Sequence, residues 1–184
     1  MENYDNAILL VIDVQVGIDE LFSRGRNNPS AEDNIARLIG VWRESGWEVV
    51  HVKHNSTEPL SPLRPELPGN DFKPQGRPLE TEKVFEKTVN SAFISTGLEN
   101  YLRENGVSDL VIVGLTTDHC VSTSTRMAAN LGFNVVLVSD ATATFSRVDK
   151  QGKEFTAEEV HAVNLLSLDG EFCQVLSTSE ILNG

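Results

Sequence analysis

Two features that are scarce in this sequence narrow the classes to which it can belong. It has only two cysteines, Cys120 and Cys173, among 184 residues, too few for the disulfide framework of a small secreted domain. No apolar run approaches the roughly 20 residues that a membrane-spanning helix needs. The first residues, MENYDNAILLVIDVQ, have no basic region and no small-residue cleavage site. We therefore expect a cytoplasmic protein with free thiols and no membrane partner.

Basic charge is also scarce. The 15 Lys and Arg residues face 27 Asp and Glu residues, which gives a formal net charge of -12 at pH 7. Nucleic acids are bound by basic faces, so this balance argues against nucleic acid as a partner. The sequence also has no G-x-G-x-x-G or G-K-[ST] loop, which disfavours nucleotide binding. The length suits one domain with a sizeable core, and we expect a single domain over residues 1–184.

Short β-rich runs alternate with helical patterns along the chain. The run AILLVID (7–13) is apolar throughout, as expected of a strand buried on both faces, whereas 31–46 has helical apolar spacing and ends on a glycine. Ser95 and Thr156 stand where helix-capping residues are expected. The same criteria predict strands at 47–54, 83–87, 108–115, 134–141 and 171–177, and helices at 95–106, 120–132 and 156–169. This alternation implies βαβ units and an α/β fold with a parallel sheet covered by helices.

One region interrupts the alternation. Residues 55–81 hold six of the seven prolines and show no helical or strand period. A connection of this length inside a domain is unusual, and it is often functional when present. Two interpretations stay open: a rigid wall or lid of an active site, and a surface excursion that packs on a partner subunit.

Three reactive side chains stand at the carboxyl ends of predicted strands, where open α/β sheets bind their ligands. Asp13 closes the first strand, Lys87 closes the third, and Cys120 follows the fourth by a short turn. Each has an ordinary alternative, since an aspartate there can cap a turn and a lysine at a strand end is usually solvated. Together they supply a nucleophile, a carboxylate base and a cation at one edge of the sheet, which is the chemistry of a thiol hydrolase.

Cys120 is the strongest single signal. It stands in the first turn of a predicted helix, where the helix dipole and free backbone N–H groups lower the pKa of a thiol. Backbone N–H groups at such a turn can also bind a developing oxyanion. The alternative is a buried apolar cysteine. Cys173, next to Phe172, fits that alternative, whereas the polar TTDH segment before Cys120 does not.

Three segments resemble the isochorismatase-like cysteine hydrolases. They are LLVIDVQ near the start, EKTVNSAF in the middle, and VGLTTDHCVSTSTRMAANLGFNVVLVSDATATF further on. The resemblance covers nearly the whole chain in the right order. It implies a three-layer α/β/α sandwich around a six-stranded, mostly parallel sheet with strand order 3-2-1-4-5-6. In that order the strands of Lys87 and Asp13 are two places apart, roughly 9–10 Å, a gap that a lysine side chain covers in large part.

The same resemblance assigns roles to residues. The family's catalytic triad maps onto Asp13, Lys87 and Cys120. Its non-proline cis peptide falls at Leu115–Thr116, and the implied purpose is to aim the N–H groups of Thr116 and Cys120 into an oxyanion hole.

The resemblance also implies an activity. It is that of a cysteine hydrolase that cleaves a C–N bond of a small amide, carbamoyl or ureido compound through a thioester. Family members that cleave a vinyl ether do not depend on the cysteine, so the presence of Cys120 favours C–N chemistry. Vinyl-ether hydrolysis stays open as an alternative, as does a non-catalytic thiol redox-sensing or binding module. Because the family is often dimeric or tetrameric, we expect a homo-oligomer.

The histidines decide whether a metal site is expected. Nicotinamidases of this family carry a D-x-H motif and a second histidine after the second strand. Here the region reads HVKHNSTEPL, with His51 and His54 but no aspartate in the motif position. On a strand these two histidines point to opposite faces. We therefore predict no required metal and no cofactor, with His54 and Phe72 as substrate-binding residues and His51 as a structural one.

Overall fold

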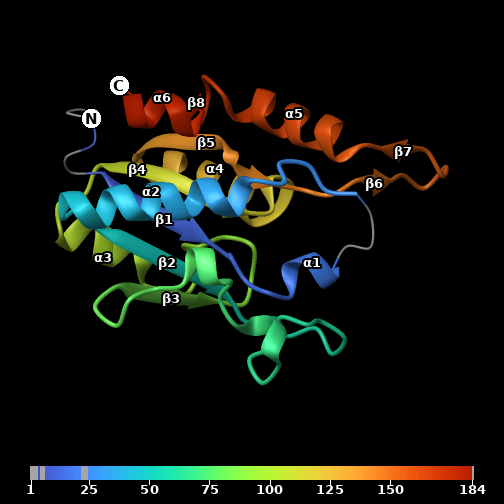
Figure 1. The fold of residues 1–184 in the computed structure, drawn as a ribbon, viewed down its shortest axis with the longest axis horizontal. Helices are drawn as coiled ribbons and strands as arrows, with labels where there is room; N and C mark the ends of the chain where they lie inside the picture. The colour runs from blue at the N-terminus through green and yellow to red at the C-terminus, as the bar shows by residue number, and fades with distance from the viewer. Residues whose placement is uncertain (1–3, 5–6, 22–24, 184) are drawn as a thin grey trace.

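The computed structural model describes residues 4, 7–21 and 25–183. At its centre is a six-stranded sheet in the order β3-β2-β1-β4-β5-β8, in which every neighbouring pair is parallel (Figure 1). The strands are β1 (Ile8–Ile12), β2 (Val49–His54), β3 (Lys83–Lys87), β4 (Asp109–Leu115), β5 (Asn134–Ala143) and β8 (Gln174–Leu176). This confirms the predicted α/β class and strand order. A hairpin of β6 (Arg147–Val148) and β7 (Glu154–Phe155), which we did not predict, precedes the last strand of the sheet.

Helices cover both faces of the sheet and give three layers (Figure 1). One face packs against α2 (Ala31–Ser45) and α6 (Thr178–Asn183), and the other against α3 (Leu98–Glu104), α4 (Ser122–Asn130) and α5 (Ala157–Leu168). The unbroken apolar run of β1 follows from this. Leu9 and Val11 belong to the core under α2, while Leu10 and Ile12 belong to the core on the opposite face.

The helix ends test the capping predictions. Gly46 ends α2 in the left-handed conformation, and Thr156 forms a reciprocal capping box with Glu159 at the start of α5, both as predicted. Ser95 is not the cap of α3. The chain enters that helix through Gly97, and the Thr96 hydroxyl accepts the Leu98 N–H at 3.2 Å instead. The short helices α1 (Ile18–Leu21) and α6 were not predicted.

The proline-rich segment packs against the residues that follow β1. Backbone hydrogen bonds run from Val16 N to Asp71 O at 2.9 Å, from Gly17 N to Gly69 O at 2.7 Å and from Lys73 N to Val14 O at 2.9 Å. A Cβ at Gly69 would lie 2.5 Å from the carbonyl oxygen of Pro62, so the segment folds tightly on itself. These contacts make the segment a firmly packed part of the chain beside the end of β1.

Strand β4 meets β1 through a glycine. Gly114 has a φ of +130°, and a Cβ there would lie 2.0 Å from the carbonyl oxygen of Ile12. The β4–β5 register shifts between Ile112 and Gly114. Only a residue without a side chain fits this contact, which lies just before the strand ends that carry the predicted site.

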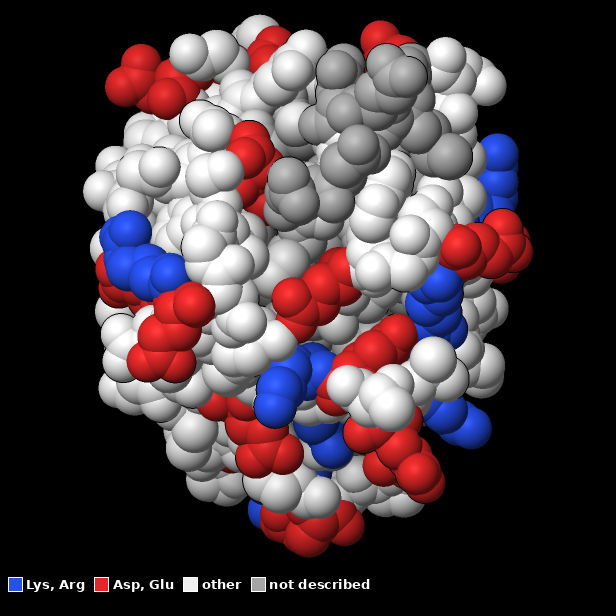
Figure 2. Space-filling view, turned by 90° about the vertical axis from the view of Figure 1, so that its left-hand side faces the viewer, with Lys and Arg blue, Asp and Glu red and all other residues white. Residues whose placement is uncertain are grey.

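The surface agrees with the charge of the sequence. Figure 2 shows acidic and basic side chains interspersed over the side that lies on the left in Figure 1, and the described residues of that side form no continuous basic area. Among the described helices, none is both long and apolar enough to cross a membrane.

Candidate active site

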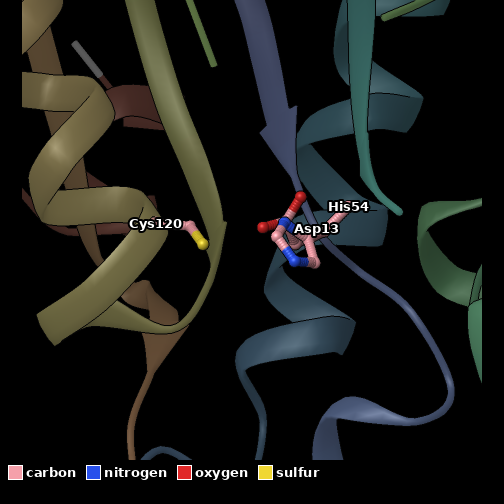
Figure 3. A group of neighbouring side chains, drawn as sticks. All are labelled: Asp13, His54 and Cys120. Carbon is pink, nitrogen blue, oxygen red and sulfur yellow. The ribbon is translucent and has the colours of Figure 1, made fainter. Parts of the chain in front are cut away.

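Side chains from the ends of four strands or strand-following segments converge at the carboxyl edge of the sheet. Lys87 Nζ donates a hydrogen bond to Asp13 Oδ2 at 2.6 Å, and it lies 3.1 Å from His54 Nδ1 and 3.4 Å from Cys120 Sγ. Asp13 and Lys87 are 1% and 2% exposed. Figure 3 shows the Cys120 sulfur facing Asp13 and His54 from the opposite side of the site. The structure thus brings together the three residues of the predicted triad and His54.

The register of β3 explains how Lys87 reaches Asp13. Ile12, just before Asp13, pairs with Val52, whereas Lys87 pairs with His54, two residues further along β2. The lysine therefore starts beyond the level of the aspartate, and its side chain crosses the end of β2. The geometric gap expected from strand spacing is closed in this way.

Gln15 holds the end of β2 in place. Its amide is fully buried, donates to the carbonyl oxygens of His54 and Asn70 at 3.0 and 2.9 Å, and accepts the His54 N–H at 2.8 Å. Asn70 also donates to the His54 carbonyl, at 2.9 Å. Both backbone groups of His54 are therefore tied to the chain after β1 and to the proline-rich segment.

Cys120 lies in a π-helical turn, Thr117–Val121, that precedes α4. Thr116 O accepts hydrogen bonds from His119 N at 3.1 Å and Val121 N at 3.2 Å. The peptide bond between Leu115 and Thr116 is cis. The sequence pattern placed Cys120 in the first turn of an α-helix, and the α-helix instead begins at Ser122.

The pKa of Cys120 is raised, not lowered as the helix-start argument predicted. Burial is the largest cause and the Asp13 carboxylate adds to it, while the Lys87 ammonium lowers the pKa by less. The helix-dipole argument applies to an exposed thiol at a helix start, whereas this thiol is desolvated. It therefore rests in the neutral form.

One oxygen of Asp13 remains available. Oδ2 receives the Lys87 ammonium, whereas the buried Oδ1 has no hydrogen-bond partner among the described residues. A carboxylate oxygen of Asp13, a ring nitrogen of His54 and Cys120 Sγ all lie within 4.8 Å of one another. The carboxylate is thus placed to receive the thiol proton, and the ammonium to stabilise the charges on both groups.

A cavity of about 110 Å³ opens at these groups. Its apolar walls come from Ile18, Leu21, Leu63 and Leu115, and its polar lining from Asn90, Thr116 and His119 together with Asp13, His54 and Cys120. Leu63 belongs to the proline-rich segment, which therefore supplies one wall.

Comparison with known proteins assigns the family. A family model described as the isochorismatase domain matches residues 7–180. The chain belongs to the isochorismatase family. It is 42% identical to an uncharacterized isochorismatase family protein of Bacillus subtilis over 97% of this chain and 96% of that protein. A crystal structure from Chromobacterium violaceum, described as of the isochorismatase family, superposes with a TM-score of 0.93 at 46% identity, covering 97% of this chain and 93% of that one.

Two other relatives carry names that describe a reaction. A streptothricin hydrolase of Streptomyces noursei is 33% identical over 74% of this chain and 54% of that protein. Nicotinamidase 3 of Arabidopsis thaliana is 27% identical over 95% of this chain and 86% of that protein.

The candidate site of this isochorismatase-family hydrolase contains side chains of the kinds that bind metal ions. Asp13, His54 and Cys120 are all ligand types that zinc accepts. The Lys87 ammonium, however, lies 2.6, 3.1 and 3.4 Å from their ligand atoms, at the place that a metal ion would take. Zinc needs distances of roughly 2.0–2.3 Å, so a metal would have to displace this cation and draw the ligands inward. The arrangement fits an ammonium ion better than a metal.

The two histidines of β2 lie in different surroundings, as the strand period predicts. His51 is fully buried and bonds Glu82 Oε2 at 2.9 Å, away from His54. Burial, followed by the Lys87 charge, lowers the pKa of His54. Its imidazole is therefore neutral at pH 7 and can accept a hydrogen bond from Lys87.

Phe72 lies elsewhere. Its ring packs edge-on against His51 at 5.9 Å between centroids and beneath Lys53 Nζ at 5.6 Å, and it is not among the residues that line the cavity. Phe72, predicted as a substrate-binding residue, is thus not at the cavity, and Leu63 of the same segment lines it. Sequence analysis missed Leu63 and Asn90. Asn90 stands in the EKTVNSAF segment three residues after Lys87, and that position was the available signal.

A larger depression, about 650 Å³, lies at the amino ends of β1, β4, β5 and β8, opposite this site. It contains Cys173, which is 9% exposed and whose pKa burial raises to about 12. Cys173 packs in the core under α4 and α5, in agreement with its interpretation as an apolar cysteine.

Proposed function

We propose that this protein hydrolyses a C–N bond of a small amide, carbamoyl or ureido compound through a thioester on Cys120. The observation that carries the proposal is the position of Lys87 Nζ, bonded to Asp13 at 2.6 Å and 3.4 Å from the Cys120 sulfur. The cation thus contacts both the nucleophile and the base, whose reactive atoms lie within 4.8 Å of each other. The names of two relatives, streptothricin hydrolase and nicotinamidase, support hydrolysis of this kind.

The first step is activation of the thiol. Because the pKa of Cys120 is raised, the thiol needs a base to take its proton as the sulfur attacks the carbonyl carbon. Asp13 takes that proton on Oδ1, the oxygen without a partner, while Lys87 keeps its contact with Oδ2. The C–S bond forms, and the carbonyl oxygen becomes an oxyanion.

The next steps stabilise the oxyanion and release the leaving group. Thr116 and Cys120 both line the cavity, and their backbone N–H groups are the proposed oxyanion donors. Asp13 returns its proton to the departing nitrogen as the C–N bond breaks, and ammonia or an amine leaves. Water then attacks the thioester carbonyl with Asp13 again as the base. Asp13 returns that proton to the Cys120 sulfur as the C–S bond breaks, which restores the thiol and releases the acid, a carboxylic acid from an amide or a carbamic acid from a carbamoyl or ureido compound.

The cavity limits the substrate. Its volume of about 110 Å³ is well below the roughly 300–1,000 Å³ of pockets for drug-sized ligands. Its aliphatic walls suit a short apolar chain. We therefore propose a compact substrate of few heavy atoms, with His54 and Asn90 as its polar contacts.

The test is a panel of small primary amides, carbamoyl and ureido compounds, with ammonia release as the readout. We expect turnover of at least one compact member, and loss of that turnover in Cys120→Ala with the fold retained. Release of ammonia that persists in Cys120→Ala would refute the thioester route. Turnover of a vinyl ether by that variant, with no amide accepted by the wild type, would instead support the vinyl-ether alternative.

A further inference from the structure

Asp118 is a buried carboxylate that the proposed reaction does not use. It stands midway between Thr116 and Cys120, and its side chain is 9% exposed. Oδ1 accepts hydrogen bonds from Thr116 Oγ1 at 2.9 Å and Thr144 Oγ1 at 2.5 Å. Oδ2 accepts two more, from Arg147 Nε at 2.9 Å and Arg147 Nη2 at 2.7 Å. Four hydrogen bonds thus meet on one carboxylate.

These bonds connect the turn that carries the nucleophile to other parts of the fold. Thr144 lies just after β5, and Arg147 lies on β6 of the hairpin. On the other side of the turn, Thr117 Oγ1 lies 2.9 Å from the Nδ1 atom of His161 on α5. The turn is therefore held by side chains from three places in the chain, the residue after β5, strand β6 and helix α5, in addition to its own backbone hydrogen bonds.

The same carboxylate also reaches the cavity wall. His119, which lines the cavity, has its Nε2 atom 3.6 Å from Asp118 Oδ2 and 3.5 Å from Arg147 Nη2. Displacement of Asp118 would thus move Thr116, Cys120 and His119 together. All three belong to the lining around the proposed oxyanion position.

We propose that Asp118, clamped by Arg147 and Thr144, is a positioning residue that holds the Cys120 sulfur against Asp13 and Lys87. It acts through the turn and does not touch the reacting atoms. The kinetic consequence rests on the proposed amide hydrolysis. The consequence for the reactivity of the thiol does not, because alkylation of Cys120 requires no substrate.

The test compares Asp118→Asn, Thr144→Val and Arg147→Met in a Cys173→Ser background, which leaves Cys120 as the single thiol. We expect kcat on an accepted amide to fall about 100-fold in Asp118→Asn, the loss typical of a small misplacement of reacting groups, with little change in KM. The rate of Cys120 alkylation by iodoacetamide at pH 8 should rise about 10-fold, because a thiol released from its buried seat has a lower pKa.

The matched controls separate positioning from stability. Arg103→Met removes an exposed pair with Glu99, with side chains 52% and 35% exposed, and should change neither rate. Thr144→Ser keeps the hydroxyl and should keep wild-type kinetics where Thr144→Val does not. If Asp118→Asn fails to fold, the Thr144 and Arg147 variants carry the same test.

Opposite movement of the two rates, with turnover down and alkylation up, supports the proposal. A lower melting temperature with unchanged kinetics would overturn it, as would an alkylation rate that does not rise. If the wild type accepts no amide, the proposed function fails, and the alkylation rates alone decide the role of Asp118.

Discussion

The ammonium nitrogen of Lys87 lies 2.6 Å from Asp13 Oδ2, although strand β2 separates the two strands that lead to them. The lysine and aspartate side chains are 0% and 1% exposed. A buried cation and a buried anion in this position depend on each other, because each would be left without compensation if the other were removed. Lys87 also lies 3.1 Å from the imidazole of His54 and 3.4 Å from the sulfur of Cys120, so one cation connects all of these groups.

Removal of the cation should therefore affect both stability and activity. We expect Lys87→Met to lower the free energy of unfolding by about 3–5 kcal/mol, since Asp13 is left as an unpaired buried charge. Turnover of any accepted amide should fall below detection. Urea denaturation and ammonia release measure the two effects. A Lys87→Met protein as stable as the wild type would show that the pair is not held as the structure indicates.

The raised pKa of Cys120 should be visible in the pH dependence of its alkylation rate. In a Cys173→Ser protein, the rate of iodoacetamide alkylation should keep rising well above pH 9.0, the ordinary thiol value, because burial and Asp13 disfavour the thiolate. In an added Asp13→Asn variant the rise should shift to lower pH, since one of the two causes is removed. A rate that levels off near neutral pH would restore the ionised thiol predicted from the helix start.

Mild acid should destabilise the fold through its histidines. The pKa values of all four histidines, His51, His54, His119 and His161, are lowered, with burial as the largest cause in each. Below about pH 6.5 the histidines of the unfolded chain therefore bind protons, whereas those of the folded protein stay neutral to a lower pH. Stability should be full above that pH and fall as the pH drops, by up to about 1.4 kcal/mol per pH unit for a fully buried histidine.

The measurement is the free energy of unfolding in urea at pH 7.5, 6.5 and 5.5. Glu32, whose pKa is lowered to about 2, loses its contribution only below its ordinary value of 4.5, which lies outside this pH range. His51→Gln should flatten the dependence more than His119→Gln, because the His119 side chain is 48% exposed and that of His51 is 0% exposed. Equal stability at pH 7.5 and 5.5 would contradict the prediction.

Gln15 should prove important for stability although it is neutral and lies outside the triad. Gln15→Met removes the hydrogen bonds to the Asn70 carbonyl and the His54 N–H and leaves the His54 carbonyl with Asn70 alone, and we expect a loss of about 2–4 kcal/mol. Gln75→Met, at an exposed position of the proline-rich segment, is the control and should stay within about 0.5 kcal/mol of the wild type. Equal midpoints for the two variants would show that the amide is dispensable.

Much of this fold could be predicted from the sequence because the local patterns agree with the overall architecture. The apolar run of β1 predicted a doubly buried strand, and its alternate residues serve two separate cores. Asp13, Lys87 and Cys120 could be found because parallel strands present their carboxyl ends at one edge. The strand order itself came from the family resemblance and not from any pattern within a strand.

The other features of the site could not be predicted because they depend on strand register and on packing in three dimensions. The contact of Lys87 with Asp13 depends on the β2–β3 register, and the raised pKa of Cys120 depends on how far the surrounding chain excludes water. Phe72 and Leu63 lie in the same proline-rich segment, and only its folded path decides that Leu63 faces the cavity while Phe72 packs on His51. Hydrophobicity alone did not distinguish the two.

The glycine at position 114 constrains any attempt to adapt this protein to new substrates. A Cβ at position 114 would lie 2.0 Å from Ile12 O, so the spacing between the strands that lead to the proposed base and nucleophile depends on this contact between two backbones. Cavity residues such as Leu21, Leu63 and Asn90 can be varied in a library without touching that span. Position 114 admits no side chain at all, and a library that includes it would sample mostly chains in which β1 and β4 have been pushed apart.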